Sequence, residues 1–196
     1  MKAKKILKKG IFTAALLNSS MLAAVTLSFD VGFVTLQDLN ITQVSSLSFG
    51  QNVFGTASSQ CTTSPSFNDT TGTGAVANAD ITDGLSGAGC INISDSVTNN
   101  FSGIYVLNGE PGQTVNITVS SVSATDFNFD PEILAVDDTA AYSAATTVTR
   151  DQPETMTLDT TSGNINLVIG GTITIGSTSL TANTTYTEQF DITATY

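Results

Sequence analysis

Apolar and polar residues alternate with a period of two along most of the sequence that follows residue 24. This period is typical of β-strands with one buried face, because successive side chains of a strand point to opposite faces. Further alternating runs span residues 39–50, 101–108 and 115–119, with Ser, Thr, Asn and Gly between them. The pattern predicts an all-β fold, a single antiparallel β-sandwich like that of immunoglobulin domains, over residues 39–196.

Two later segments predict individual strands of this fold. In INLVIGGTITIG, residues 165–176, the glycine pair could form a two-residue hairpin turn, but that arrangement would mix the two faces. One continuous strand keeps the apolar residues together, so we expect Gly170 and Gly171 at a bulge or a close backbone approach. In TTYTEQFDITATY, residues 184–196, one parity is apolar except for Glu188. This predicts a strand at the end of the chain.

The first 24 residues have the form of a secretory signal peptide. Five lysines within residues 2–9 precede a short apolar stretch that ends in small residues. The remaining chain then holds one basic residue, Arg150, against 17 acidic ones, a net charge of −16. Such a chain is not expected to bind nucleic acid, which requires clustered Lys and Arg, and no membrane span is expected after residue 24.

Cys61 and Cys90 are the two cysteines of the sequence. In an exported chain such a pair predicts an intrachain disulfide, and the histidines or further cysteines of a zinc site are lacking. The segment between them up to residue 80 is rich in Ser, Thr, Gly and Asn, so we expect it to be largely loop.

Catalysis and cofactors are not expected. The sequence lacks histidine, and its lysines all precede residue 10, so nucleophiles activated by His or Lys cannot be assembled after the signal. One weak calcium candidate remains in DFNFDPE, formed by Asp126, Asn128, Asp130 and Glu132. Pro131 stands where a calcium loop of the EF-hand type requires glycine, so we favour a strand with its acids in water.

Three stretches resemble a family of bacterial secreted β-sandwich domains: LSFG at 47–50, LNGEPGQTVNITV at 107–119, and residues 170–196. The shared marks are a GEPG-like corner, a GGT strand and a final strand of the form TY-x-x-x-F-x-φ-T-x-x-Y, where φ is apolar. The sequence is also similar to pilins assembled by a chaperone and an usher, which share a signal peptide, a free N-terminal strand and one disulfide. The resemblance implies a surface or fimbria-like protein of a Gram-negative bacterium, exported through the periplasm.

The stretch 25–38 therefore has two interpretations. It can close its own sandwich as a first strand, or it can act as a donor strand that adds to the open edge of a neighbouring copy. The second interpretation predicts a filament subunit that polymerises head to tail without covalent links, with a periplasmic chaperone and an outer-membrane usher as further partners. Its donor residues are Val25, Leu27, Phe29, Val31 and Phe33. The alternative is a monomeric adhesin or carbohydrate-binding module that uses its few tyrosines as ring platforms: Tyr105, Tyr142, Tyr186 and Tyr196.

Overall fold

The computed structural model describes residues 34–196, and Thr35–Tyr196 form one compact all-β unit. The predicted signal and the segment 25–33 lie outside the described residues. Thirteen strands and two short 3-10 helices make up the described part. In chain order the elements are β1 (Asn40–Ser45), β2 (Gln60–Thr63), β3 (Ser66–Phe67), η1 (Asn78–Asp80), β4 (Ile81–Leu85), β5 (Ile93–Ser96), β6 (Gly103–Asn108), β7 (Thr114–Val119), β8 (Val122–Ser123), β9 (Phe127–Asp137), η2 (Tyr142–Ala144), β10 (Thr146–Val148), β11 (Glu154–Thr157), β12 (Asn164–Ile175) and β13 (Ile192–Thr195).

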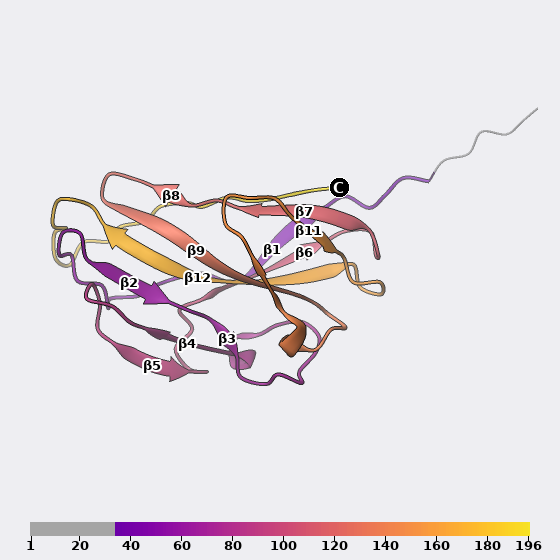
Figure 1. Ribbon diagram of the computed structural model, residues 1–196, viewed down its shortest axis with the longest axis horizontal. Helices are drawn as coiled ribbons and strands as arrows, with labels where there is room; N and C mark the ends of the chain where they lie inside the picture. The colour runs from indigo at the N-terminus through magenta and orange to yellow at the C-terminus, as the bar shows by residue number, and fades with distance from the viewer. Residues whose placement is uncertain (1–33) are drawn as a thin grey trace, which may run out of the picture. The chain divides into compact units, whose positions relative to one another are not determined.

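A seven-stranded antiparallel sheet forms the centre of the fold (Figure 1). Its main order is β1-β6-β12-β9-β10, while β2 pairs with the second half of β12 and β8 pairs with β9. The predicted continuous strand is confirmed, because β12 runs unbroken from Asn164 to Ile175. Gly171 has φ +145°, and a Cβ on Gly170 would collide with the carbonyl oxygen of Thr63. The glycine pair therefore lets β2 and β9 approach the backbone of β12 closely.

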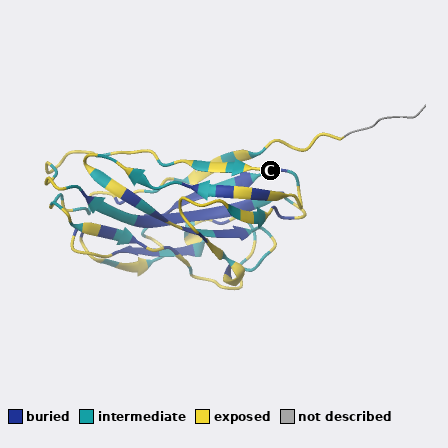
Figure 2. Cartoon of the chain, turned by 45° about the horizontal axis from the view of Figure 1, so that its top comes forward, coloured by how far each residue is buried: buried dark blue, intermediate teal, exposed yellow. Residues whose placement is uncertain are grey.

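Both faces of the central sheet are covered. On one face Leu107, Ile165 and Leu167 pack against Val115 and Ile117 of the sheet β11-β7-β13. On the other face the buried side chains come from the central strands, from β4 and from the connecting segments: Val76, Ile81, Ile104, Val136, Tyr142 and Val168. Figure 2 shows the buried residues concentrated on the central strands. Two covered faces explain why every position of the first half of β12 after Asn164 is buried, as in central strands of doubly covered sheets.

The second cover is a small sheet of the order β3-β4-β5, built from the segment between the two cysteines and the residues just after it. The predicted disulfide is confirmed: Cys61 of β2 is bonded to Cys90, with their Cα atoms 5.3 Å apart. Backbone hydrogen bonds between Thr62 and Ser86 also join β2 to the end of β4. Residues 64–65 and 68–77 lie outside strands and helices, so the expectation that residues 60–80 are largely loop holds, with two short strands inside it.

The GEPG stretch forms a corner between the central sheet and the sheet β11-β7-β13, as the family resemblance implies. The Gln113 N–H donates to the Glu110 carbonyl at 3.2 Å, and Gly112 has φ +75°, as the third position of a type II turn requires. β6 before the turn belongs to the central sheet and β7 after it to the covering sheet, so the turn is a corner rather than a hairpin.

Two predicted strands are shorter than expected. The run 39–50 forms β1 only as far as Ser45, with a bulge that leaves Val44 exposed. The run 184–196 forms β13 only over Ile192–Thr195. The reason for the second difference is that its partner β7 ends at Val119, where the chain crosses to the central sheet as β8. Residues 184–190 therefore have no strand beside them within the described part of the chain.

Asp159 lies in the turn between β11 and β12 and makes the free energy of unfolding depend on pH. The N–H of Ser162 (2.6 Å), the hydroxyl of Thr139 (2.7 Å) and the N–H of Thr161 (2.9 Å) all donate to its carboxylate. These donors hold the pKa of Asp159 well below its usual value. Because the folded-state pKa is the lower one, the unfolded chain takes up a proton first as pH falls, so this contribution is complete above about pH 4 and is lost below it.

We therefore expect Asp159→Asn to unfold with a shallower dependence on pH than the natural chain between about pH 4 and pH 2. Urea unfolding at a series of pH values measures this slope. The matched control is Asp126→Asn, because the exposed Asp126 side chain accepts no hydrogen bond from residues 34–196. Equal slopes for the natural chain and Asp159→Asn would contradict the assignment.

Candidate functional site

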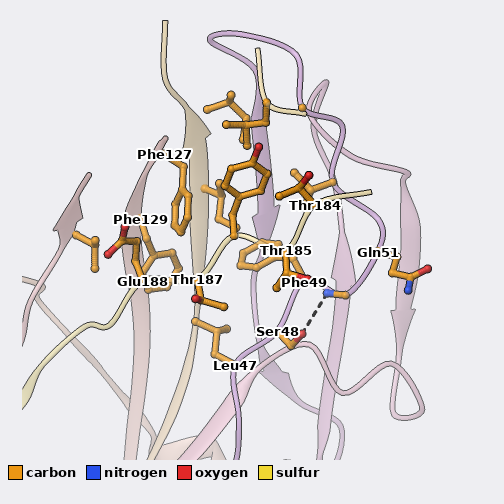
Figure 3. Close-up of a pocket in the computed structure, with 18 of the residues that line it drawn as sticks. Leu47, Ser48, Phe49, Gln51, Phe127, Phe129, Thr184, Thr185, Thr187 and Glu188 are labelled. Carbon is orange, nitrogen blue, oxygen red and sulfur yellow. Dashed lines mark hydrogen bonds between the residues drawn. The ribbon is translucent and has the colours of Figure 1, made fainter. Parts of the chain in front are cut away.

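A long groove opens along one side of the fold, between the edge of the central sheet and the edge strand β13 (Figure 3). We call it the edge groove. One wall is the segment 46–56, which follows β1, and the other is the segment 179–192, which leads into β13. The cavity measures about 1250 Å³. This volume exceeds the range of about 300–1,000 Å³ that is usual for small-molecule pockets.

The floor of the edge groove is aromatic and aliphatic. It is lined by Tyr105, Phe127, Phe129, Ile173 and Ile175, and Phe49 and Phe190 of the two walls pack onto it. Phe129 is buried against Phe49, with ring centroids 6.5 Å apart and planes at 81°, and against Phe190 at 5.7 Å. Tyr105 meets Phe190 edge to face at 5.9 Å, and burial raises the pKa of the Tyr105 hydroxyl. These contacts between rings from β6, β9 and the two walls give the groove a packed, preformed base.

The wall 46–56 is held from behind by the disulfide region. The Ser48 N–H donates to the Phe101 carbonyl at 2.9 Å, and the Phe54 N–H donates to the Gly89 carbonyl at 2.6 Å. Val53 forms an isolated antiparallel bridge with Cys90. The Cys61–Cys90 disulfide therefore fastens this wall to β2, and through β2 to the central sheet.

The opposite wall is unusual because its backbone is unpaired. No backbone N–H or C=O group of residues 184–190 makes a hydrogen bond to any residue of 34–196. The contacts that fix this segment are at its ends and through side chains. The Leu180 N–H donates to the Gly55 carbonyl, the Tyr186 hydroxyl accepts from the Thr181 N–H, and Phe190 packs on the floor. Free main-chain groups of this kind are available to pair with an added strand, as those of a sheet edge are.

Side chains that could perform chemistry are scarce in the edge groove. Glu188 and Asp191 are its only ionisable carboxylates, and the remaining polar lining consists of hydroxyl and amide side chains. Within residues 34–196, no group of three or more Cys, Asp or Glu side chains is arranged to hold a metal ion. The lining of the groove therefore combines aromatic and aliphatic side chains with hydroxyl and amide groups.

The calcium candidates do not converge on one point. Asn128, Asp130 and Glu132 follow one another along β9, and Asp126 directly precedes it. Asp130 pairs with Arg150 at 3.5 Å, and Glu132 accepts a hydrogen bond from the Ser64 hydroxyl at 2.7 Å. Phe129 between them is buried, as the strand interpretation expects.

The four tyrosines are engaged in the fold rather than displayed together. Tyr142 is buried and stacks on Phe67, with centroids 4.6 Å apart. The Tyr196 hydroxyl donates to the Gln37 carbonyl and accepts from the Glu110 N–H. Tyr105 and Tyr186 line the edge groove.

Sequence reasoning did not identify the groove itself. Leu47 and Phe49 carried a signal, because their alternation with Ser46 and Ser48 continues past the end of β1. Their position opposite Phe190 depends on tertiary structure, which the alternation does not report.

No family model matches the chain, and neither a curated protein nor a solved structure is similar to it. Residues 34–196 contain no helix of the length and apolar character needed to cross a membrane.

Proposed function

We propose that the protein is a structural subunit of a bacterial surface filament, in which residues 25–33 of one copy add as a strand to the edge groove of the next. The observation that carries this proposal is the combination of an apolar floor with a wall whose backbone is unpaired. Strand addition uses both features, since main-chain hydrogen bonds supply affinity and alternating side-chain pockets supply specificity.

The gross energy of such a joint follows from the apolar side chains that it would bury. Burying the five apolar donor side chains contributes a gross free energy of roughly 7–15 kcal/mol, at about 1.5–3 kcal/mol each. Ordering the donor and the wall opposes part of this gain. The remainder must overcome the repulsion between copies that each carry a net charge of −16 after residue 24. The contact joins two different surfaces of the same chain, so it continues into a fibre unless a rotation happens to close a ring.

The donor is long enough to pair along the whole of residues 184–190. Nine extended residues span about 30 Å, and the seven unpaired residues 184–190 span about 23 Å. The donor alternates five apolar side chains with Thr26, Ser28, Asp30 and Gly32. One face of the donor is therefore suited to the aromatic floor, and its other face is suited to water.

The disulfide and the all-β fold are compatible with an extracellular location. Export through the periplasm, with a chaperone that occupies the groove before assembly and an usher in the outer membrane, completes the proposal. The monomeric adhesin receives less support, because none of the four tyrosines forms an exposed platform with another.

The test is the size of the purified chain that starts at Val25. We expect a ladder of multimers for the natural chain in analytical ultracentrifugation. Phe29→Asp should abolish the multimers, because it places an uncompensated charge in an apolar pocket at a cost of several kcal/mol. A synthetic peptide of residues 25–33 should bind to the Phe29→Asp monomer.

The matched control is Ser28→Asp, which adds the same charge on the opposite face of the same strand and should leave the multimers intact. A natural chain that sediments as a monomer, with the amides of residues 25–33 protected from hydrogen exchange, would contradict the proposal and assign the strand to its own domain. Multimers that survive Phe29→Asp would contradict it as well.

A further inference from the structure

We propose that residues 184–190 are a latent extension of β13, which becomes a strand only when the donor of a second copy occupies the edge groove. This inference rests on the proposed function and adds to it the backbone that receives the donor. The sequence motive is the alternation of TTYTEQFDITATY, which runs without a break into β13 although only Ile192–Thr195 are paired. The structural motive is the absence of any backbone hydrogen bond from residues 184–190 to the rest of 34–196.

The segment lacks a partner on the β7 side for a definite reason. The last pairing of β13 with β7 is Ile192 with Val119, followed by the hydrogen bond from the Ser120 N–H to the Asp191 carbonyl at 3.0 Å. Beyond that point the chain of β7 leaves for the central sheet, where Val122 pairs with Phe129 of β9. A strand over 184–190 must therefore obtain its hydrogen bonds from the other side, which faces the groove.

The register of β13 assigns the groups that would form these bonds. The backbone groups of successive residues point to opposite sides of a strand, and those of Asp191 point toward β7. If the strand is continued from Asp191 toward residue 184, the N–H and C=O groups of Tyr186, Glu188 and Phe190 point away from β7 and toward the donor. In the same strand, the N–H and C=O groups of Thr185, Thr187 and Gln189 point toward the β7 side, where β7 no longer lies beside them.

Side chains already occupy the positions that this strand requires. Phe190 packs on Phe129 and Tyr105 of the floor, and Tyr186 is half-buried, so the inward parity is set at two positions before any partner arrives. Glu188 has the same parity and is exposed. A donor in the groove supplies the pairing that converts this anchored, extended segment into a strand.

Hydrogen exchange tests the inference directly. The Phe29→Asp chain is mixed with a fluorescent peptide of residues 25–33, binding is followed by anisotropy, and exchange is followed by mass spectrometry. We expect the backbone amides within 184–190 to slow by at least about tenfold in the complex, since protection follows from new hydrogen bonds. Binding without protection of 184–190 would overturn the inference and leave the proposed function standing. Absence of peptide binding would overturn both.

Proline substitutions test which backbone N–H groups of residues 184–190 point toward the donor. Proline removes one N–H, so Glu188→Pro should weaken peptide binding at least about tenfold, through the lost hydrogen bond and the distortion of the pairing. Gln189→Pro removes an N–H that points away from the donor and should bind the peptide as the parent chain does. Glu188→Ala controls for the lost carboxylate. Equal weakening by both prolines would contradict the assigned register, as would no weakening by either.

Discussion

Replacing Asp83 by alanine is expected to destabilise the protein by about 2–5 kcal/mol, measured by urea unfolding. Asp83 lies on β4 and is 2% exposed. One of its carboxylate oxygens, Oδ2, accepts the N–H groups of Phe101 at 2.8 Å and Ser102 at 2.7 Å, just before β6 begins. The substitution leaves two buried N–H groups without an acceptor, and each such loss costs about 1–3 kcal/mol. Asp83 thereby joins the small sheet to the central sheet.

Asp83→Asn separates the hydrogen bonds from the charge. Its amide oxygen can accept the same two N–H groups, and it removes a buried charge for which residues 34–196 supply no basic partner, because Arg150 pairs with Asp130. The second carboxylate oxygen, Oδ1, has no hydrogen-bond partner among these residues. We expect Asp83→Asn to lie within about 1 kcal/mol of the natural chain. A loss as large as that of the alanine variant would contradict this account and assign the stabilisation to the charge.

Removing the disulfide is expected to have the second large effect. The bond closes a segment with a sequence separation of 29, for which the chain-entropy relation gives roughly 3.6 kcal/mol. The double variant Cys61→Ala with Cys90→Ala should lose about this much free energy of unfolding. The loss acts on the unfolded chain, while the folded chain also loses the fastening of the groove wall 46–56.

Reduction of the natural chain with dithiothreitol is the control for packing, because both sulfur atoms are buried among Phe49, Leu85, Phe101 and Phe129. Reduction keeps these atoms and breaks only the bond. If reduction left the free energy of unfolding unchanged and only the alanine pair lowered it, packing rather than the cross-link would be responsible.

Local pattern was enough to predict much of the fold. Period-two alternation in the sequence located β7, whose buried and open positions alternate, and also β6 and β12, although these two are buried on both faces. The corner after β6 was expected from the resemblance of the GEPG stretch, and its turn has local backbone requirements that Gly112 meets with a positive φ. The small sheet β3-β4-β5 was not predicted, because strands of two to five residues in a polar segment carry little periodic signal.

Less of the edge groove could be predicted from the sequence. Alternation over 184–196 predicted one strand, and it correctly placed Phe190, Ile192 and Ala194 on the core side. It could not show that β7 turns away after Val119, because that turn is a property of the partner strand. The edge groove exists because β7 ends at Val119, while the alternating segment that contains β13 extends further, over residues 184–196. The predicted donor, Val25–Phe33, lies outside the described residues and stays a prediction.

The position of Arg150 in the chain has a consequence for proteolysis. Arg150 is the sole basic residue after residue 9, and it lies in the turn between β10 and β11. A protease that cuts after Lys or Arg therefore has one site in the described chain. A cut there would leave β11 paired with β7, and β12 paired with β6 and β9. The two pieces would stay interlocked in the same sheets, so such a protease could cut the backbone without separating the folded chain into two parts.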